Sequence, residues 1–373
     1  MKHVLFFFLA TILMISCGSA SSNASESAGS GDNPTSLTAI SDTLPASFFK
    51  KFSGTIGDLP IVINLSRSNE KISGSYYYSK IGVPIALEGS IKKDGSFEIN
   101  EYGNGNVTGT LEGIIPAKGG FSGTWKNANK SKTLPLTLSE ITEGFAQITF
   151  EDRSAKNCKL ASKDMDMNGS EDGCTTLNVH FLTVNTPSPE VSGKINTALI
   201  SNNSGSSYTT EKINTLDQLM KIVNIDSPEE GFNAEISYDV VTNENNIICI
   251  SNYSDWYSFG AAHSDHGITY TNFDLRTGNI IQLEELLNPG FEKELNRIAE
   301  ANFTKENGSE EWDFEPGNFP LNRNFAIQPG GLLFTFYPYE IGPYVAGSPS
   351  VFVSYKSIAK LVKPGGLLAS WNQ

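Results

Sequence analysis

Between residues 48 and 138 the chain repeats one pattern, a short apolar or alternating run that ends near Gly, Asn or Asp. Eight such runs follow one another, at 48–56, 60–65, 72–78, 84–91, 96–100, 107–115, 121–125 and 134–138. Runs so short and so regularly interrupted are typical of antiparallel strands joined by turns, and no window has the period of an amphipathic helix. The sequence therefore predicts an all-β antiparallel domain at 46–142, a meander that forms a barrel or a sandwich.

Within these runs a glycine recurs before Ser or Thr, at Gly54, Gly74, Gly89, Gly109 and Gly123. A glycine inside a strand lets the sheet bend or bulge, so closure of a barrel is the interpretation we favour. A second hypothesis is a ligand-holding barrel in which Tyr76, Tyr77, Tyr78 and Trp125 stack on the ligand. Because side chains alternate along a strand, Tyr76 and Tyr78 are predicted to share one face and Tyr77 to lie on the other.

Residues 145–373 mix the strand and helix periods and predict an α+β domain. The predicted strands are 177–184, 232–241, 332–337 and 351–354. Helical spacing of apolar residues predicts helices at 216–223, 284–303 and 357–362. Thr277 and Gly278 predict a hairpin turn between two short apolar runs.

The N-terminus has the form of an export signal, because Lys2 is followed by an almost entirely apolar run at 4–15. That run is too short to span a bilayer. It ends in Ser16-Cys17-Gly18, which resembles a bacterial lipobox, in which the cysteine is diacylated and becomes the new N-terminus. The predicted signal peptide and its lipobox cysteine therefore occupy residues 1–17, and the alternative is an ordinary signal peptide with an incidental cysteine.

Residues 18–45 are rich in Ser, Gly and Ala and predict a flexible tether. No Asp follows Cys17, which by analogy with lipoprotein sorting predicts an outer-membrane anchor that faces the periplasm or the cell surface. No later stretch has 18 consecutive apolar residues, so no transmembrane helix is expected. The membrane contact that we expect is made by the lipid on Cys17.

The chain of 373 residues carries 27 Lys and Arg against 41 Asp and Glu, a formal charge of −14. This balance argues against nucleic acid or anionic lipid as the main partner, since phosphate binding needs clustered Lys and Arg. It leaves cationic partners open. No nucleophile elbow, phosphate-binding glycine loop, H-E-x-x-H or C-x-x-C motif occurs. We therefore expect a protein that is not an enzyme and has no cofactor.

Three cysteines follow Cys17 in the chain. Cys158 and Cys174 bracket a polar stretch, and export favours a disulfide between them over two free thiols. Cys249 lies in an apolar run and is predicted to be a buried thiol. Residues 164–172 begin like a calcium-binding loop, but Thr175 stands where the last acidic ligand is required, so we favour a solvated acidic turn.

Two short segments combine histidine, aromatic and acidic residues. The candidate binding residues are His263, Asp265, His266, Tyr337, Tyr339, Glu340 and Tyr344. Aromatic rings beside acids suit sugar stacking or a protein interface, although the same mixture occurs where a core meets its rim. The two histidines and Asp265 could in principle bind zinc. The flanking glycines favour a tight turn instead, and no metal site is predicted.

Two longer motifs carry a family resemblance. Residues 263–287 read HSDHGITYTNFDLRTGNIIQLEELL, and residues 334–347 read FTFYPYEIGPYVAG before VFVSY at 351–355. They resemble an extracytoplasmic domain of unknown function that is found in the lysozyme-sensing anti-sigma factor RsiV and in the peptidoglycan deacetylase PdaC. The resemblance covers about residues 231–362 and extends less closely over 145–230.

The resemblance implies binding rather than catalysis. In RsiV-like proteins the domain binds lysozyme, and in PdaC-like enzymes it accompanies a catalytic domain that this sequence lacks. No catalytic residue of the family is carried over. We therefore expect a cell-envelope lipoprotein that binds a cationic partner such as lysozyme. One alternative is a peptidoglycan- or glycan-binding module, and another is an envelope hydrolase that uses His263, His266 or a pair of carboxylates.

Overall fold

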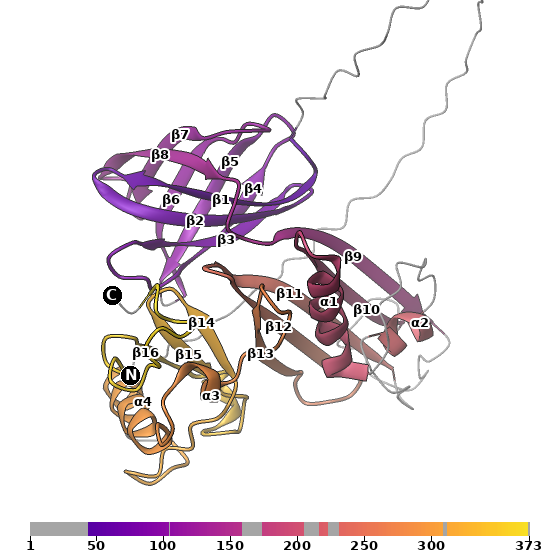
Figure 1. The fold of residues 1–373 in the computed structure, drawn as a ribbon. Coiled ribbons are helices and arrows are strands. Elements are labelled where there is room, and N and C mark those ends of the chain that lie inside the picture. The colour runs from indigo at the N-terminus through magenta and orange to yellow at the C-terminus, as the bar shows by residue number, and fades with distance from the viewer. Residues whose placement is uncertain are drawn as a thin grey trace, which may run out of the picture.

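The computed structural model describes residues 44–103, 105–158, 174–204, 216–222, 231–308 and 312–371. The predicted signal, Cys17, most of the tether and the acidic stretch 164–172 lie outside these residues. Within them, no helix is long and apolar enough to cross a membrane. The chain forms a barrel, a five-stranded sheet and a smaller layer of helices and strands, in that order (Figure 1).

The N-terminal part is a closed barrel of eight antiparallel strands. The strands are β1 Ser47–Ile56, β2 Leu59–Ser68, β3 Lys71–Tyr78, β4 Ile85–Ile91, β5 Ser96–Gly103, β6 Asn106–Ile114, β7 Phe121–Asn127 and β8 Thr133–Ile141. Each pairs with its neighbours in sequence, and β1 closes the barrel by pairing with β8. At the closure a Cβ on Gly54 would lie 1.9 Å from the carbonyl oxygen of Thr137, so only glycine fits there. The barrel prediction is confirmed.

The three consecutive tyrosines of β3 divide as their alternation predicts. Tyr76 and Tyr78 belong to the apolar interior of the barrel, where their rings meet edge to face at 5.5 Å. The phenol of Tyr76 donates a hydrogen bond to Glu101 across the interior. Tyr77 points outward instead, and its hydroxyl donates to the carboxylate of Glu244 in the next part of the chain.

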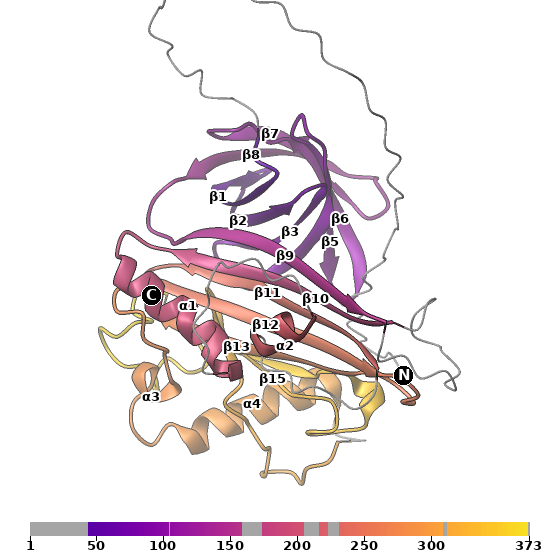
Figure 2. The same cartoon turned by 90° about the vertical axis from the view of Figure 1, so that its right-hand side faces the viewer.

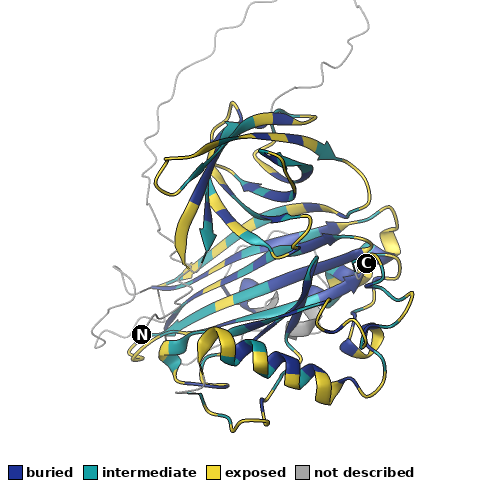
Figure 3. Cartoon of the chain, turned by 90° about the vertical axis from the view of Figure 1, so that its left-hand side faces the viewer, coloured by how far each residue is buried: buried dark blue, intermediate teal, exposed yellow. Residues whose placement is uncertain are grey.

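A five-stranded sheet in the order β13-β12-β11-β10-β9 follows the barrel. Its strands are β9 Gln147–Asn157, β10 Thr175–Asn185, β11 Phe232–Glu244, β12 Ile247–Ser258 and β13 Asp265–Asp274. β10 and β11 are parallel, and the other neighbours are antiparallel. Helices α1 Pro189–Ser204 and α2 Leu216–Ile222 lie over one face (Figure 2). Along β10 and β11 buried residues alternate for most of their length with half-buried or exposed ones, because the face opposite the helices is more open to solvent (Figure 3).

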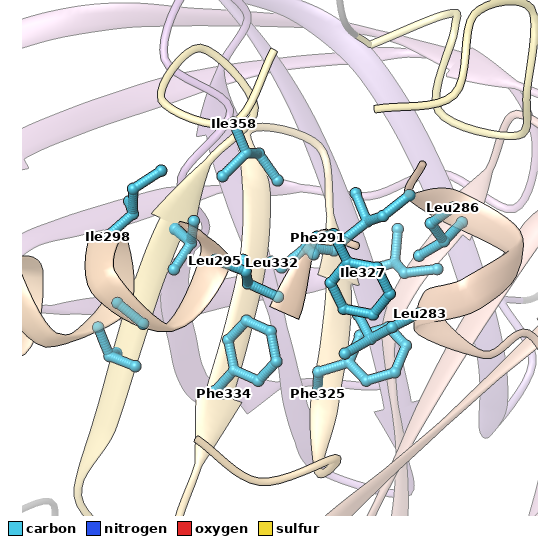
Figure 4. Packing of buried hydrophobic residues seen from close by; sticks show 14 of the residues in the cluster. Leu283, Leu286, Phe291, Leu295, Ile298, Phe325, Ile327, Leu332, Phe334 and Ile358 are labelled. Carbon is cyan, nitrogen blue, oxygen red and sulfur yellow. The ribbon is translucent and has the colours of Figure 1, made fainter. Parts of the chain in front are cut away.

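The last part of the chain packs helices on a three-stranded sheet. It contains α3 Leu283–Leu286, α4 Glu292–Asn307, β14 Phe325–Gln328, β15 Gly331–Thr335, the 3-10 turn η1 Tyr344–Ala346 and β16 Ser350–Ser354. Apolar side chains of α3 and α4 meet those of β14 and β15 in one core (Figure 4). Ile358, which follows β16, packs into the same core.

Two helix predictions in this region are wrong. The helix predicted at 284–303 is divided into α3 and α4, because Pro289 and Gly290, with φ +83°, stand between them. The helix predicted at 357–362 is a series of turns. Its backbone pairs instead with a segment that is distant in the chain. The amide of Asn288 donates a hydrogen bond to the carbonyl of Leu361, and Leu287 forms an isolated β-bridge with Val362.

The barrel is attached to the rest of the protein by buried polar contacts. Lys51 of β1, which is 4% exposed, forms an ion pair with Glu244 at the end of β11. Lys51 also donates to the carbonyl of Asn243 at 3.1 Å. At a second place the loop after β3 meets the turn between β14 and β15, where a Cβ on Gly82 would lie 2.6 Å from Cα of Gly330.

Candidate functional site

The two segments that carry the candidate residues meet at the edge strand β13. His263 lies in the turn before β13, whereas Tyr339 and Tyr344 lie in the segment between β15 and β16. The ring of His263 stacks on that of Tyr344, with centroids 3.9 Å apart. His266 meets the ring of Tyr344 edge-on at 5.5 Å, and Tyr339 lies 5.5 Å from Tyr344. We call His263, His266, Tyr339 and Tyr344 the ring cluster.

Hydrogen bonds hold Tyr344 at the centre of the ring cluster. Its hydroxyl donates to the carbonyl of Ser264 at 2.5 Å and lies 3.3 Å from Nδ1 of His266. Nδ1 of His263 lies 2.9 Å from the same carbonyl, and its Nε2 lies 3.4 Å from the hydroxyl of Tyr339. The predicted turn at the histidines is therefore present, and hydrogen bonds tie it to a segment 76 to 80 residues further along the chain.

Tyr339 has an exposed side chain and an unfavourable backbone conformation. Its side chain is 64% exposed, and its φ of +68° lies in the left-handed region, which bulky residues rarely adopt. Such a conformation costs on the order of 1–3 kcal/mol, and it persists only where the surroundings impose it. A strained aromatic residue that faces solvent is a candidate for a binding role, because the core gains little from it.

The two candidate carboxylates have different surroundings. Glu340 is held by its own loop, where it accepts hydrogen bonds from the amide of Tyr337 at 2.8 Å and from Asn322 at 2.9 Å. Asp265 is exposed at the first position of β13. Burial and then the negative charges of Glu340 and Asp265 raise the pKa of Tyr337. Both acids therefore add negative charge beside the ring cluster.

A row of polar residues continues from the ring cluster across the open face of the sheet. Glu235 on β11, Asp255 on β12 and His266 on β13 stand opposite one another in register. Glu235 is exposed and Asp255 is half-buried. Beside them, burial followed by the charges of Asp255 and Glu235 raises the pKa of Tyr253 to about 12. Asp255 stands beside Trp256 and Tyr257 in the sequence, another place where an acid meets aromatic residues, whereas Glu235 has no such signal and is brought to the site by strand register alone.

The predicted cysteine residues lie away from the ring cluster. Cys158 and Cys174 form a disulfide that joins the end of β9 to the start of β10, as predicted. Cys249 is a free thiol with no exposed surface, and burial raises its pKa. Among the residues that the structure describes, no group of three or more His, Cys, Asp or Glu is arranged to hold a metal ion. The ring cluster and the carboxylates beside it thus form an aromatic and acidic surface built by distant segments of the chain.

Tyr337 is seated beside the ring cluster by a glycine. A Cβ on Gly267 in β13 would lie 2.3 Å from the ring of Tyr337. The substitution Gly267→Ala is therefore expected to displace this ring and to lower the free energy of unfolding by about 1–3 kcal/mol, as overpacking does. Urea denaturation measures the effect.

The control for this prediction removes the ring. Once Tyr337 is alanine, Gly267→Ala has nothing to displace, so the double variant is expected to match Tyr337→Ala in stability. If Gly267→Ala lowers the free energy of unfolding equally with and without the Tyr337 ring, the loss arises from the strand itself. That result would contradict the proposed clash with Tyr337.

Comparison with known proteins places a family match on this part of the chain. Residues 284–356 match the model of a family described as a protein of unknown function, DUF3298, so the chain contains a DUF3298 domain. The match includes the segment from Tyr337 to Tyr344. No curated protein matches the chain.

Solved structures of other proteins resemble the chain, and two of them are examples from the DUF3298 family. A member of the DUF3298 family from Bacteroides fragilis NCTC 9343 is 14% identical, with a TM-score of 0.48 over 62% of this chain and 99% of that chain. A DUF3298 family protein from Pseudomonas aeruginosa PAO1 is 18% identical, with a TM-score of 0.41 over 58% of this chain and 94% of that chain.

Proposed function

We propose that this chain is a non-catalytic lipoprotein of the cell envelope that binds a basic extracytoplasmic protein of the lysozyme type. The binding surface consists of the ring cluster, Tyr337, and the carboxylates of Asp265, Glu340, Asp255 and Glu235. The observation that carries the proposal is the convergence of exposed aromatic rings and carboxylates from separate segments on one surface. The anchor is the lipid on Cys17, which follows from the lipobox resemblance.

The chemistry of the surface suits a cationic protein. Tyrosine rings bury large area at low entropic cost and are enriched among residues that dominate binding. The strained and exposed Tyr339 is the residue that we assign to the centre of the contact. Carboxylates around it attract a positive partner and raise its rate of association. The charge of the chain agrees, because residues 143–373 contain 30 Asp and Glu against 15 Lys and Arg.

The resemblance of residues 231–362 to RsiV-like domains supports the same partner class, since those domains bind lysozyme. The resemblance includes both segments of the ring cluster. The proposal concerns binding of the partner and does not include a sensing role of the RsiV kind.

The proposal is tested by titrating lysozyme into residues 18–373, which lack the lipidated cysteine. We expect binding at about 50 mM NaCl that weakens at about 300 mM, as screening of opposite charges requires. Tyr339→Asn is expected to weaken binding by at least about tenfold, as loss of a central aromatic residue does. Since asparagine tolerates a positive φ, the same variant is expected to be as stable as the parent or more stable.

Matched variants separate this surface from general effects. Leu59, which is 53% exposed on the barrel, provides the control Leu59→Asn, and its affinity is expected to be unchanged. Glu235→Gln with Asp255→Asn should slow association and reduce the salt dependence, whereas Glu88→Gln with Glu98→Gln on the barrel should not. Absence of lysozyme binding at both salt concentrations would end the lysozyme version of the proposal.

A glycan-binding role is the second candidate, and the flat exposed ring of Tyr339 beside the stacked His263 and Tyr344 favours it. Sugars stack on such rings. Soluble muropeptides that quench tryptophan fluorescence in the parent and not in Tyr339→Asn would select this role over a protein partner.

A further inference from the structure

The end of the barrel from which the N-terminal segment departs has a distinct surface, which we call the barrel base. It consists of residues 92–95 between β4 and β5, residues 114–118 at the end of β6, and Leu44. A cavity of about 400 Å³ opens between them. Leu44, Ile115, Pro116 and Ala117 line its apolar side, and Lys93 and Lys118 stand beside them.

The lysines of the barrel base are held on ordered loops. The amide of Ile115 donates to the carbonyl of Gly95 at 2.9 Å, which joins the two loops, and Lys50 donates to the carbonyl of Ala117 at 3.1 Å. The carboxylate of Asp94, which also borders the cavity, is engaged by the amide and hydroxyl of Ser96 at 2.9 and 2.7 Å. Lys93 and Lys118 are exposed.

An exposed apolar side chain accompanies the lysines. Ile114, the last residue of β6, is 59% exposed. It lies beside the turn between β4 and β5, since its Cγ2 would be 3.6 Å from a Cβ on Gly95. An apolar tip flanked by lysines fits the boundary between head groups and acyl chains of a membrane, because the apolar group enters the acyl region while the amines meet phosphate.

The charge of the barrel differs from that of the whole chain. Residues 46–142 contain 11 Lys and Arg against 8 Asp and Glu, whereas residues 143–373 contain 15 against 30. The net charge of −14 for the whole chain argues against anionic lipid as a main partner. The excess of acidic over basic residues that gives this charge, however, lies outside the barrel. The part of the chain next to the tether is positive.

We propose that the barrel base docks on an anionic lipid surface, with Lys93 and Lys118 paired to lipid phosphates and Ile114 inserted between the head groups. This inference adds a protein contact to the lipid anchor of the proposed function. A flexible tether, as the sequence predicts for the 26 residues between Cys17 and Leu44, would span roughly 28 Å, so an acylated Cys17 would leave the barrel base within reach of the same leaflet. Docking there leaves the ring cluster, which is in a different part of the fold, available to its partner.

The test is flotation of residues 18–373, which carry no acyl group, with vesicles of phosphatidylcholine containing about 30% phosphatidylglycerol. We expect binding at about 50 mM NaCl and none to pure phosphatidylcholine. Because each lysine near an anionic surface contributes about fivefold, Lys93→Gln with Lys118→Gln should weaken binding about 25-fold. Ile114→Ser should weaken it without changing its salt dependence.

The control removes the same charge from the other end of the barrel. Lys130 and Lys132 are exposed in the turn between β7 and β8, and Lys130→Gln with Lys132→Gln should bind vesicles like the parent. Equal losses in the two double variants, or no binding of the parent to anionic vesicles, would overturn the inference. Palmitate labelling of Cys17 and lysozyme binding are measured separately, so failure of the anchor or of the proposed partner is distinguishable from failure of this contact.

Discussion

Replacing Glu244 with alanine is expected to lower the free energy of unfolding by about 3–5 kcal/mol, because it leaves a buried ammonium group without its counter-ion. Lys51 is 4% exposed where the barrel meets the sheet, and Glu244 is its ion-pair partner. Burial lowers the pKa of Lys51, and the charge of Glu244 opposes that shift. The hydroxyl of Tyr77 would lose its acceptor in the same variant.

A second lysine–glutamate pair supplies the control. Lys126 and Glu112 are paired at 2.8 Å on the barrel surface, with side chains 28% and 34% exposed. Because water screens this pair, Glu112→Ala is expected to cost less than about 1 kcal/mol. Urea denaturation measures both variants. Similar costs for Glu112→Ala and Glu244→Ala would contradict the assigned role of burial at the junction.

A further variant distinguishes the net contribution of the ion pair from the cost of leaving one buried charge unpaired. Replacing Lys51, Tyr77 and Glu244 together with methionine, phenylalanine and leucine removes every charged member of the contact. Well-packed apolar residues often replace a buried ion pair at little cost, so this variant is expected to recover most of the stability that Glu244→Ala loses. The Lys51–Glu244 pair would then serve mainly to specify how the barrel sits on the sheet.

Phe303→Ala is expected to lower the free energy of unfolding by about 3–5 kcal/mol, as loss of a fully buried aromatic side chain does. Phe303 of α4 has no exposed surface, and the rings of Trp312 and Phe319 lie 4.8 and 5.2 Å from it. It also contacts Phe336 at 6.3 Å, and Phe336 directly precedes Tyr337. The cavity left by Phe303 would therefore loosen the segment that carries three of the candidate rings.

The effect on the site is separated from stability by a matched variant. Phe52 is equally buried in the barrel and meets Phe121 edge to face at 5.2 Å. Phe52→Ala is expected to destabilise the protein by a similar amount, about 3–5 kcal/mol, without weakening lysozyme binding by the folded chain. Phe303→Ala is expected to weaken it. Equal affinities of the two variants would show that the core under α4 does not position the candidate site.

The eight barrel strands could be predicted because each depends on local signals. A strand is recognised from the alternation of apolar residues along it and from turn residues at its ends, and both signals lie within a few residues of one another. The division of the predicted helix at 284–303 was also accessible, since Pro289 and Gly290 are helix-breaking residues, but helical spacing on both sides concealed it. The turns at 357–362 were not accessible, because a distant segment engages that backbone.

For the candidate site, the sequence identified which residues have suitable chemistry, and the tertiary structure decided their arrangement. His263 and Tyr344 stack only because the last sheet packs along the edge of β13, where Asn324, directly before β14, accepts a hydrogen bond from the amide of Tyr270 and donates one to the carbonyl of Ile268. Glu235 and Asp255 join them through strand register, which depends on pairing between distant parts of the chain.

By itself, therefore, the sequence determined the barrel, the paired cysteines and the residue types available for recognition, all of which depend on short-range order or composition. The tertiary structure alone decided the ion pair at the barrel junction, the ring stack and the lysine-bordered cavity at the barrel base. The reason is that each of these is a contact between residues far apart in the chain, and such contacts depend on how complete elements pack rather than on any local pattern.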